Sequence, residues 1–258
     1  MNTEFRTREP HDWWNTVALG VAVVIAFLML WLGACSSVSQ SAANSNKAAA
    51  KASDTPTPPA SASPVNTMGE SVPTSLADAG EYGENVYDYA KANDWKNAEA
   101  RLGTLNETLK KVRADVKSQG AAVDRLDGNV AALGRAVSTK DRQATMREAN
   151  QVTLDVANMT TAYKLRVPVE VTMLDYYGRE LEVWAQAKDA NKLQATAREM
   201  RRTWDALRPS VQSRNAAEAK KFEALVARVE AAQTPVDYER VAKPVLDEVD
   251  NLEKVFHG

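Results

Sequence analysis

Cysteine and histidine are almost absent from this 258-residue chain. The only cysteine is Cys35, so the long region after it can form no disulfide and offers no thiolate for metal binding or nucleophilic attack. The two histidines are His11 and His257, which leaves the region between them without the commonest general base. The phosphate-binding glycine loop, the Gly-x-Ser-x-Gly nucleophile turn and the His-Glu metal-binding helix motif are also missing. We therefore expect a protein that is not an enzyme, with no catalytic residue, no metal and no cofactor.

A large excess of charge of one sign is missing too. Lysine and arginine number 32, against 34 aspartate and glutamate residues, and the formal net charge is -2. Nucleic-acid-binding domains usually carry a strong positive excess, which this chain does not have. We expect no nucleic-acid partner.

The chain contains one long apolar run, Thr16 to Ala34, whose nineteen residues include no charge. This length is about what a helix needs to span a bilayer. Arg6 and Arg8 precede the run and no basic residue follows it until Lys47, a distribution that places the carboxyl side outside the cytoplasm. The run is either a signal sequence or a retained anchor, and it predicts a membrane association through the amino terminus.

The end of this run, Leu32-Gly33-Ala34-Cys35, resembles the lipobox of bacterial lipoproteins. In that family small residues precede a cysteine that is acylated and becomes the new amino terminus. The resemblance implies that residues 1–35 form a lipoprotein signal and that Cys35 is the lipidation site. The alternative is a plain transmembrane helix that ends in a cysteine, and both alternatives hold the remaining chain at the cell membrane, on the periplasmic or extracellular face.

Residues 36–73 are almost entirely Ser, Ala, Thr, Asn and Pro. A segment of this composition cannot bury a hydrophobic core, so we expect a disordered linker that spaces the folded region from the membrane. The folded region should comprise two helical halves, residues 74–166 and 167–258.

The two halves contain an internal duplication. Residues 82–118 return 95 residues later as residues 177–213, and the two copies align without a gap. The identical pairs include Tyr82/Tyr177, Gly83/Gly178, Ala90/Ala185, Ala92/Ala187, Asp94/Asp189, Ala100/Ala195, Arg113/Arg208, Val116/Val211 and Ser118/Ser213. The repeated glycines, Gly83 and Gly178, indicate places where helices approach each other closely, because glycine otherwise weakens a helix.

Four aspartates divide the duplication further. Asp94, Asp141, Asp189 and Asp237 are separated by 47, 48 and 48 residues, and each lies in a short polar interruption. Aspartate suits the start of a helix, where its side chain accepts a hydrogen bond from a free amide. The pattern predicts four αα-hairpin quasi-repeats of about 48 residues, with Thr234-Pro235 as the cap and first residue of the last helix. The alternative is that these aspartates lie on the exposed faces of long, unbroken helices.

Apolar residues recur at steps of three and four, as in amphipathic helices, and no alternation typical of strands is sustained. The predicted fold class is therefore all-α. The eight expected helices span residues 75–92, 94–118, 121–138, 141–164, 171–187, 190–207, 215–232 and 235–256. Pro209 should end the sixth helix and Pro244 should kink the eighth. Two arrangements satisfy the pattern: a short solenoid of four hairpins, or two four-helix bundles joined near residues 167–172.

The candidate binding residues are Asp175, Tyr176, Arg179 and Glu180, which crowd into the stretch LDYYGRELEVW at 174–184. One hypothesis is that this charged and aromatic cluster lines a groove for a ligand or a partner. The simpler interpretation is that Asp175 and Arg179 form an i,i+4 ion pair while Tyr177, Leu181 and Trp184 pack in the core.

Three further groups of carboxylates could converge on an ion if they faced inward. We expect these side chains to be solvated, because carboxylates on amphipathic helices usually face water. The groups are Glu180 with Glu182, Asp247 with Glu248 and Asp250, and Glu148 with Asp155.

The sequence thus predicts a tethered, non-enzymatic interaction or scaffold module that binds another protein of the cell envelope. The alternative function is a helical solute- or metal-binding lipoprotein that holds its ligand between the two halves and presents it to a transporter or sensor.

Overall fold

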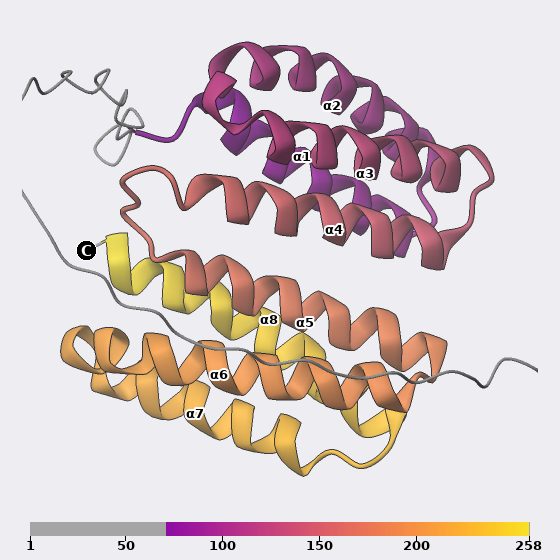
Figure 1. Cartoon of the computed structure of the whole chain (residues 1–258). Coiled ribbons are helices and arrows are strands. Elements are labelled where there is room, and N and C mark those ends of the chain that lie inside the picture. Colours follow the sequence, from indigo (N-terminus) through magenta and orange to yellow (C-terminus); the bar gives the residue numbers. More distant parts are fainter. Residues whose placement is uncertain (1–70, 258) are drawn as a thin grey trace, which may run out of the picture. The chain divides into compact units, whose positions relative to one another are not determined.

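The computed structural model describes residues 71–257, so the predicted anchor, Cys35 and most of the predicted linker lie outside the described residues. Within 71–257 the chain forms eight α-helices and one short 3-10 helix, without any strand (Figure 1). This confirms the all-α prediction. The elements are α1 Thr74–Lys91, α2 Trp95–Asp115, η1 Lys117–Gln119, α3 Gly120–Ser138, α4 Arg142–Thr160, α5 Val169–Ala187, α6 Ala190–Arg214, α7 Ala216–Ala231 and α8 Pro235–His257. None of the helices in this described part is long and apolar enough to cross a bilayer.

The helices form two four-helix bundles. In the first, α1 and α3 each pack against α2 and α4; in the second, α5 and α7 each pack against α6 and α8. The bundles are joined where α4 packs against α5, as Figure 1 shows. Each bundle is closed, because its first helix contacts its fourth. The structure is therefore the paired-bundle arrangement and not the solenoid.

Each bundle has its own hydrophobic core. Among the large, fully buried side chains of the first core are Leu76, Tyr87, Leu105, Leu126, Leu133 and Met146. Those of the second include Leu174, Leu181, Leu193, Trp204 and Phe222. The rings of Trp204 and Phe222 lie 4.8 Å apart between centroids, so they join α6 to α7 at the centre of the second core.

Three of the four repeated aspartates begin helices, as predicted. The carboxylates of Asp94, Asp141 and Asp189 accept hydrogen bonds from backbone N–H groups three residues later, at 3.2, 3.0 and 3.0 Å. The residue before each aspartate has a left-handed backbone, with φ between 54° and 58°. The same tight turn thus joins α1 to α2, α3 to α4 and α5 to α6, and the alternative of unbroken helices is wrong.

The fourth aspartate has a different place. Asp237 lies in the first turn of α8, where its Oδ2 accepts hydrogen bonds from the N–H and the hydroxyl of Thr234, at 3.1 and 2.7 Å. The Thr234 hydroxyl in turn accepts from the Asp237 N–H at 3.3 Å. This reciprocal pair is a capping box, and Pro235 is the first residue of α8, as expected.

The two repeated glycines lie at close helix contacts, which confirms their interpretation. A Cβ atom on Gly83 in α1 would lie 3.0 Å from Val152 Cγ1 in α4. A Cβ atom on Gly178 in α5 would lie only 2.6 Å from Leu246 Cδ2 in α8. In both bundles, glycine lets the first helix approach the fourth.

The prediction that Pro209 ends the sixth helix is wrong, because α6 continues through Pro209 to Arg214. Proline removes one backbone hydrogen bond, but Leu207 and Val211 on either side of it are buried in the second core. Burial of these side chains holds the helix together. Pro244 likewise lies inside α8, which runs on to His257.

Candidate functional site

The predicted cluster Asp175, Tyr176, Arg179 and Glu180 lies on α5 at the junction between the two bundles. We call this region the junction; it also includes Glu84, Tyr87, Asp88 and Lys91 of α1 and Asn150 of α4. Many of the residues that contact the cluster therefore come from the first bundle of the same chain.

Arg179 makes the largest number of junction contacts. Its Nε donates to Asp175 Oδ2 at 2.8 Å, which confirms the predicted i,i+4 pair. Its Nη2 lies 3.5 Å from Glu84 Oε2, and its Nη1 lies 3.6 Å from Asp88 Oδ1. The guanidinium also lies over the Tyr87 ring, 4.9 Å from the centroid. Because only 11% of the Arg179 side chain is exposed, these contacts replace most of its hydration.

A second group of contacts surrounds Glu182 of α5. Lys91 Nζ lies 2.6 Å from both carboxylate oxygens, and the Tyr87 hydroxyl donates to Oε2 at 2.9 Å. Glu182 is buried, so the expectation that it would be solvated is wrong. Its burial is tolerated because both oxygens have donors on α1.

On the α4 side, the buried Asn150 donates from Nδ2 to the backbone oxygen of Tyr176 at 3.1 Å and to Glu180 Oε1 at 3.2 Å. The Trp184 indole N–H donates to the other oxygen of Glu180. Leu181 is buried, while Tyr177 is partly buried against the second core. The stretch 174–184 therefore shows both features of the simpler interpretation: an ion pair and side chains packed in the core.

Burial and charge shift the pKa values at the junction. Burial raises the pKa of Glu84 from 4.5 to about 7, although Arg179 acts in the opposite direction. Burial likewise raises the pKa of Asp175, again opposed by Arg179. For Arg179, burial alone would lower the pKa, but the charges of Asp175 and Glu84 outweigh it and raise the pKa. Glu84 and Asp175 therefore retain protons to a higher pH than exposed carboxyl groups do, mainly because they are buried.

Sequence reasoning missed the α1 residues of the junction. Glu84, Tyr87, Asp88 and Lys91 are unremarkable on an amphipathic helix, and only their packing against α5 gives them a role. One signal was available. In the alignment at offset 95, Glu84 is the equivalent of Arg179 and Tyr87 is the equivalent of Glu182, and these pairs touch in the structure.

Another buried carboxylate, Asp155, lies in the first bundle and was expected to be solvated. It is 3% exposed, accepts a hydrogen bond from the Asn129 amide and lies 3.4 Å from the Arg125 guanidinium. Within residues 71–257, no group of three or more His, Cys, Asp or Glu side chains is arranged to hold a metal ion.

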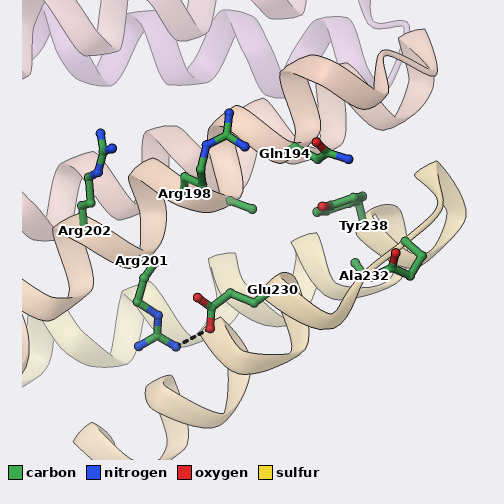
Figure 2. Close-up of a pocket in the computed structure, with 9 residues that line it drawn as sticks. Gln194, Arg198, Arg201, Arg202, Glu230, Ala232 and Tyr238 are labelled. Carbon is green, nitrogen blue, oxygen red and sulfur yellow. Dashed lines mark hydrogen bonds and ion pairs between the residues drawn. The ribbon is translucent and has the colours of Figure 1, made fainter.

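The second bundle contains a pocket of about 480 Å³, which sequence reasoning did not find (Figure 2). One wall is a single face of α6, formed by residues at helical spacing: Gln194, Ala197, Arg198, Arg201 and Arg202. The opposite side is formed by Glu230 in α7, by Ala232 and Gln233 between α7 and α8, and by Tyr238 in the first turn of α8. We call this the α6–α8 pocket.

The three arginines of the pocket differ in their ion-pair partners. Arg201 binds Glu230 at 2.7 Å, Glu223 at 2.9 Å and Asp205 at 3.4 Å, and it thereby ties α6 to α7. Arg202 binds Glu199 in its own helix at 2.6 Å. Arg198 makes no ion pair with any carboxylate of the described part of the chain. Figure 2 shows Arg201 turned toward Glu230, while Arg198 and Arg202 point away from it.

Comparison with protein-family models, with curated proteins and with solved structures finds no match to this chain.

Proposed function

We propose that this chain is a membrane-tethered, non-enzymatic interaction module outside the cytoplasm, in which two helical bundles act together as a scaffold for another component of the cell envelope. The apolar run and Cys35 in the sequence support the tether. The linker after Cys35 would hold the bundles away from the bilayer.

The observation that carries the scaffold role is the junction. Arg179 and Glu182 on α5 are both largely buried, and each is held by two or more side chains of α1. Contacts between buried charges are directional, so they favour one relative placement of the surfaces that carry them. A scaffold needs this property, because its partner must find both bundles in a fixed arrangement.

We also propose that the second bundle arose by duplication of the first. The equivalent glycines, Gly83 and Gly178, support this, since each lies against the fourth helix of its bundle. The junction supports it too. Glu84 with Arg179, and Tyr87 with Glu182, are equivalent positions that now carry complementary groups. After duplication, one surface would have adapted to bind its own copy.

Cell fractionation of the full chain expressed in a bacterium tests the tether. We expect the protein in the membrane fraction, with the folded region cleaved by protease added outside spheroplasts. Mass spectrometry of the mature protein should find an acylated Cys35, and Cys35→Ser should abolish this modification. A chain that stays soluble in the cytosol would contradict the proposal.

Site-specific photo-cross-linking in the native cell tests the scaffold. We expect one envelope protein to be captured from exposed positions on both bundles, such as Asn106 and Ala227. The junction variant Arg179→Met should reduce capture from at least one of them. Capture of no protein from any exposed position, with the chain folded and correctly located, would refute the scaffold role.

A further inference from the structure

We propose that the α6–α8 pocket binds a small organic ligand through an anionic oxygen group, either a carboxylate or a phosphate. The proposal depends on the geometry of this pocket in the second bundle. It does not depend on the tether or on the scaffold role, so each can fail without the other.

The positive charge of the pocket comes from Arg198 and Arg202. They lie four residues apart on one face of α6, both exposed at the pocket wall. Arg198 has no carboxylate partner within residues 71–257, and the Arg202–Glu199 pair is at the surface, where such a pair contributes little. A planar guanidinium presents paired N–H donors that match the two oxygens of a carboxylate or phosphate. Arg198 is therefore available as the principal anchor.

The one acidic residue of the pocket does not cancel this charge. Glu230 is bound to Arg201 at 2.7 Å, and that arginine also binds Glu223. Glu230 is therefore already paired with a cation, and the network of Arg201 joins α6 to α7. A ligand that reaches Arg198 thus meets an uncompensated cation.

Tyr238 supplies a second, independent indication of a ligand. The residue is only 5% exposed, and its hydroxyl forms no hydrogen bond with any described residue. In Figure 2 the hydroxyl end of Tyr238 points toward α6 across the pocket. Arg198 and Tyr238 line the same pocket. Burial raises the pKa of Tyr238, and the charge of Arg198 acts in the opposite direction. A hydroxyl that opens onto the pocket without a protein partner is free to donate a hydrogen bond to a bound group.

The pocket has room for a ligand larger than an inorganic ion. Its volume of about 480 Å³ is within the range of small-molecule sites, roughly 300–1,000 Å³. The floor is apolar, because Ala197, Ala232 and the Tyr238 ring are all buried. The oxyanion would lie between Arg198 and the Tyr238 hydroxyl, and an apolar body would cover the floor. Gln194 and Gln233 at the rim add amide donors and acceptors.

Isothermal titration calorimetry of the full chain in a non-ionic detergent tests the proposal with three probes: benzoate, phenyl phosphate and dihexanoyl phosphatidylglycerol. We expect binding of at least one, weakened by added salt because the contact is ionic. Arg198→Gln should weaken binding about tenfold to a hundredfold, as expected for a charge-assisted hydrogen bond. Tyr238→Phe, which keeps the buried ring, should weaken it about fivefold.

The matched control is Arg135→Gln, which removes an equally exposed arginine from α3 in the other bundle and should leave affinity unchanged. Binding of the lipid alone would support a lipid headgroup as the source of the oxyanion, and binding of the soluble probes would support a free solute. No binding of any probe at millimolar concentration would overturn the proposal. Equal losses of affinity in Arg198→Gln and Arg135→Gln would overturn it as well, because they would show that the probe is attracted by the general charge of the chain and not by this pocket.

Discussion

Replacement of Arg179 by methionine should strongly destabilise the fold. The change keeps a long apolar side chain but removes the guanidinium that binds Asp175 at 2.8 Å. Both side chains of this pair are mostly buried, at 11% and 19% exposed. Removal of one partner from a buried pair costs about 3–5 kcal/mol, because the other charge is left uncompensated. The expected cost for Arg179→Met is about 3 kcal/mol, the lower end of this range, because Glu84 and Asp88 are more exposed and add less.

Thermal unfolding followed by circular dichroism measures this effect on the full chain. For a folded region of this size, 1 kcal/mol shifts Tm by roughly 2–4 °C, so Arg179→Met should lower Tm by about 6–12 °C. The exposed control Arg135→Met should change stability by no more than about 0.5 kcal/mol. The double variant Arg179→Met with Asp175→Asn should recover part of the loss, because no charge then stays buried without a partner.

A change in Tm of less than about 2 °C in Arg179→Met would refute this reasoning. It would mean that the junction is hydrated in solution and that its charges do not fix the bundles. Failure of the double variant to recover any stability would locate the loss in packing, for example the contact of Arg179 with the Tyr87 ring, and would contradict the assignment to Asp175.

Three other predictions concern single positions. Gly178→Ala should lower Tm, because its Cβ would lie 2.6 Å from Leu246 Cδ2. The control Gly103→Ala on α2 places its Cβ in open space and should raise stability by up to about 1 kcal/mol. Thermal melts that rank the two variants in the opposite order would contradict the packing of α5 against α8. Asp189→Ala should cost about 1 kcal/mol in urea unfolding, because it removes the cap of α6, while Asp189→Asn should cost little. The folded chain keeps a proton on Glu84 up to about pH 7, while the unfolded chain releases it near pH 4.5, so its contribution to the free energy of unfolding should fall as pH rises between these values. Glu84→Gln should flatten this dependence by a modest amount, since 36% of the side chain is exposed, and an unchanged pH profile would count against the shift.

The features of the fold that could be predicted from sequence are those set by nearby residues. Asp94, Asp141 and Asp189 cap helices through contacts only three residues long, so their role is visible in the sequence. The spacing of apolar residues at steps of three and four also involves only nearby residues, so it predicts where the helices lie. Pro209 shows the limit of local rules, because the burial of its neighbours in the second core outweighs the preference of proline to end a helix.

The junction and the α6–α8 pocket depend on contacts between distant parts of the chain. The unusual composition at 174–184 located one side of the junction, but the α1 residues that complete it are ordinary helix residues. The burial of Glu182 follows only from the packing of α5 against the first bundle. The α6–α8 pocket likewise results from packing between helices that are distant in the sequence. Arg198 is exposed by its helical position, but its proximity to Tyr238 requires the second bundle to be closed.

The central claim is that the junction holds the two bundles as one body. Double electron–electron resonance tests it most directly, with spin labels on cysteines at Asn106 in α2 and Ala227 in α7 and with Cys35 replaced by serine. Both labelled positions are exposed, so the labels should not disturb either core. We predict one narrow distance distribution that broadens in Arg179→Met. A broad distribution already present before the junction is changed would contradict the account.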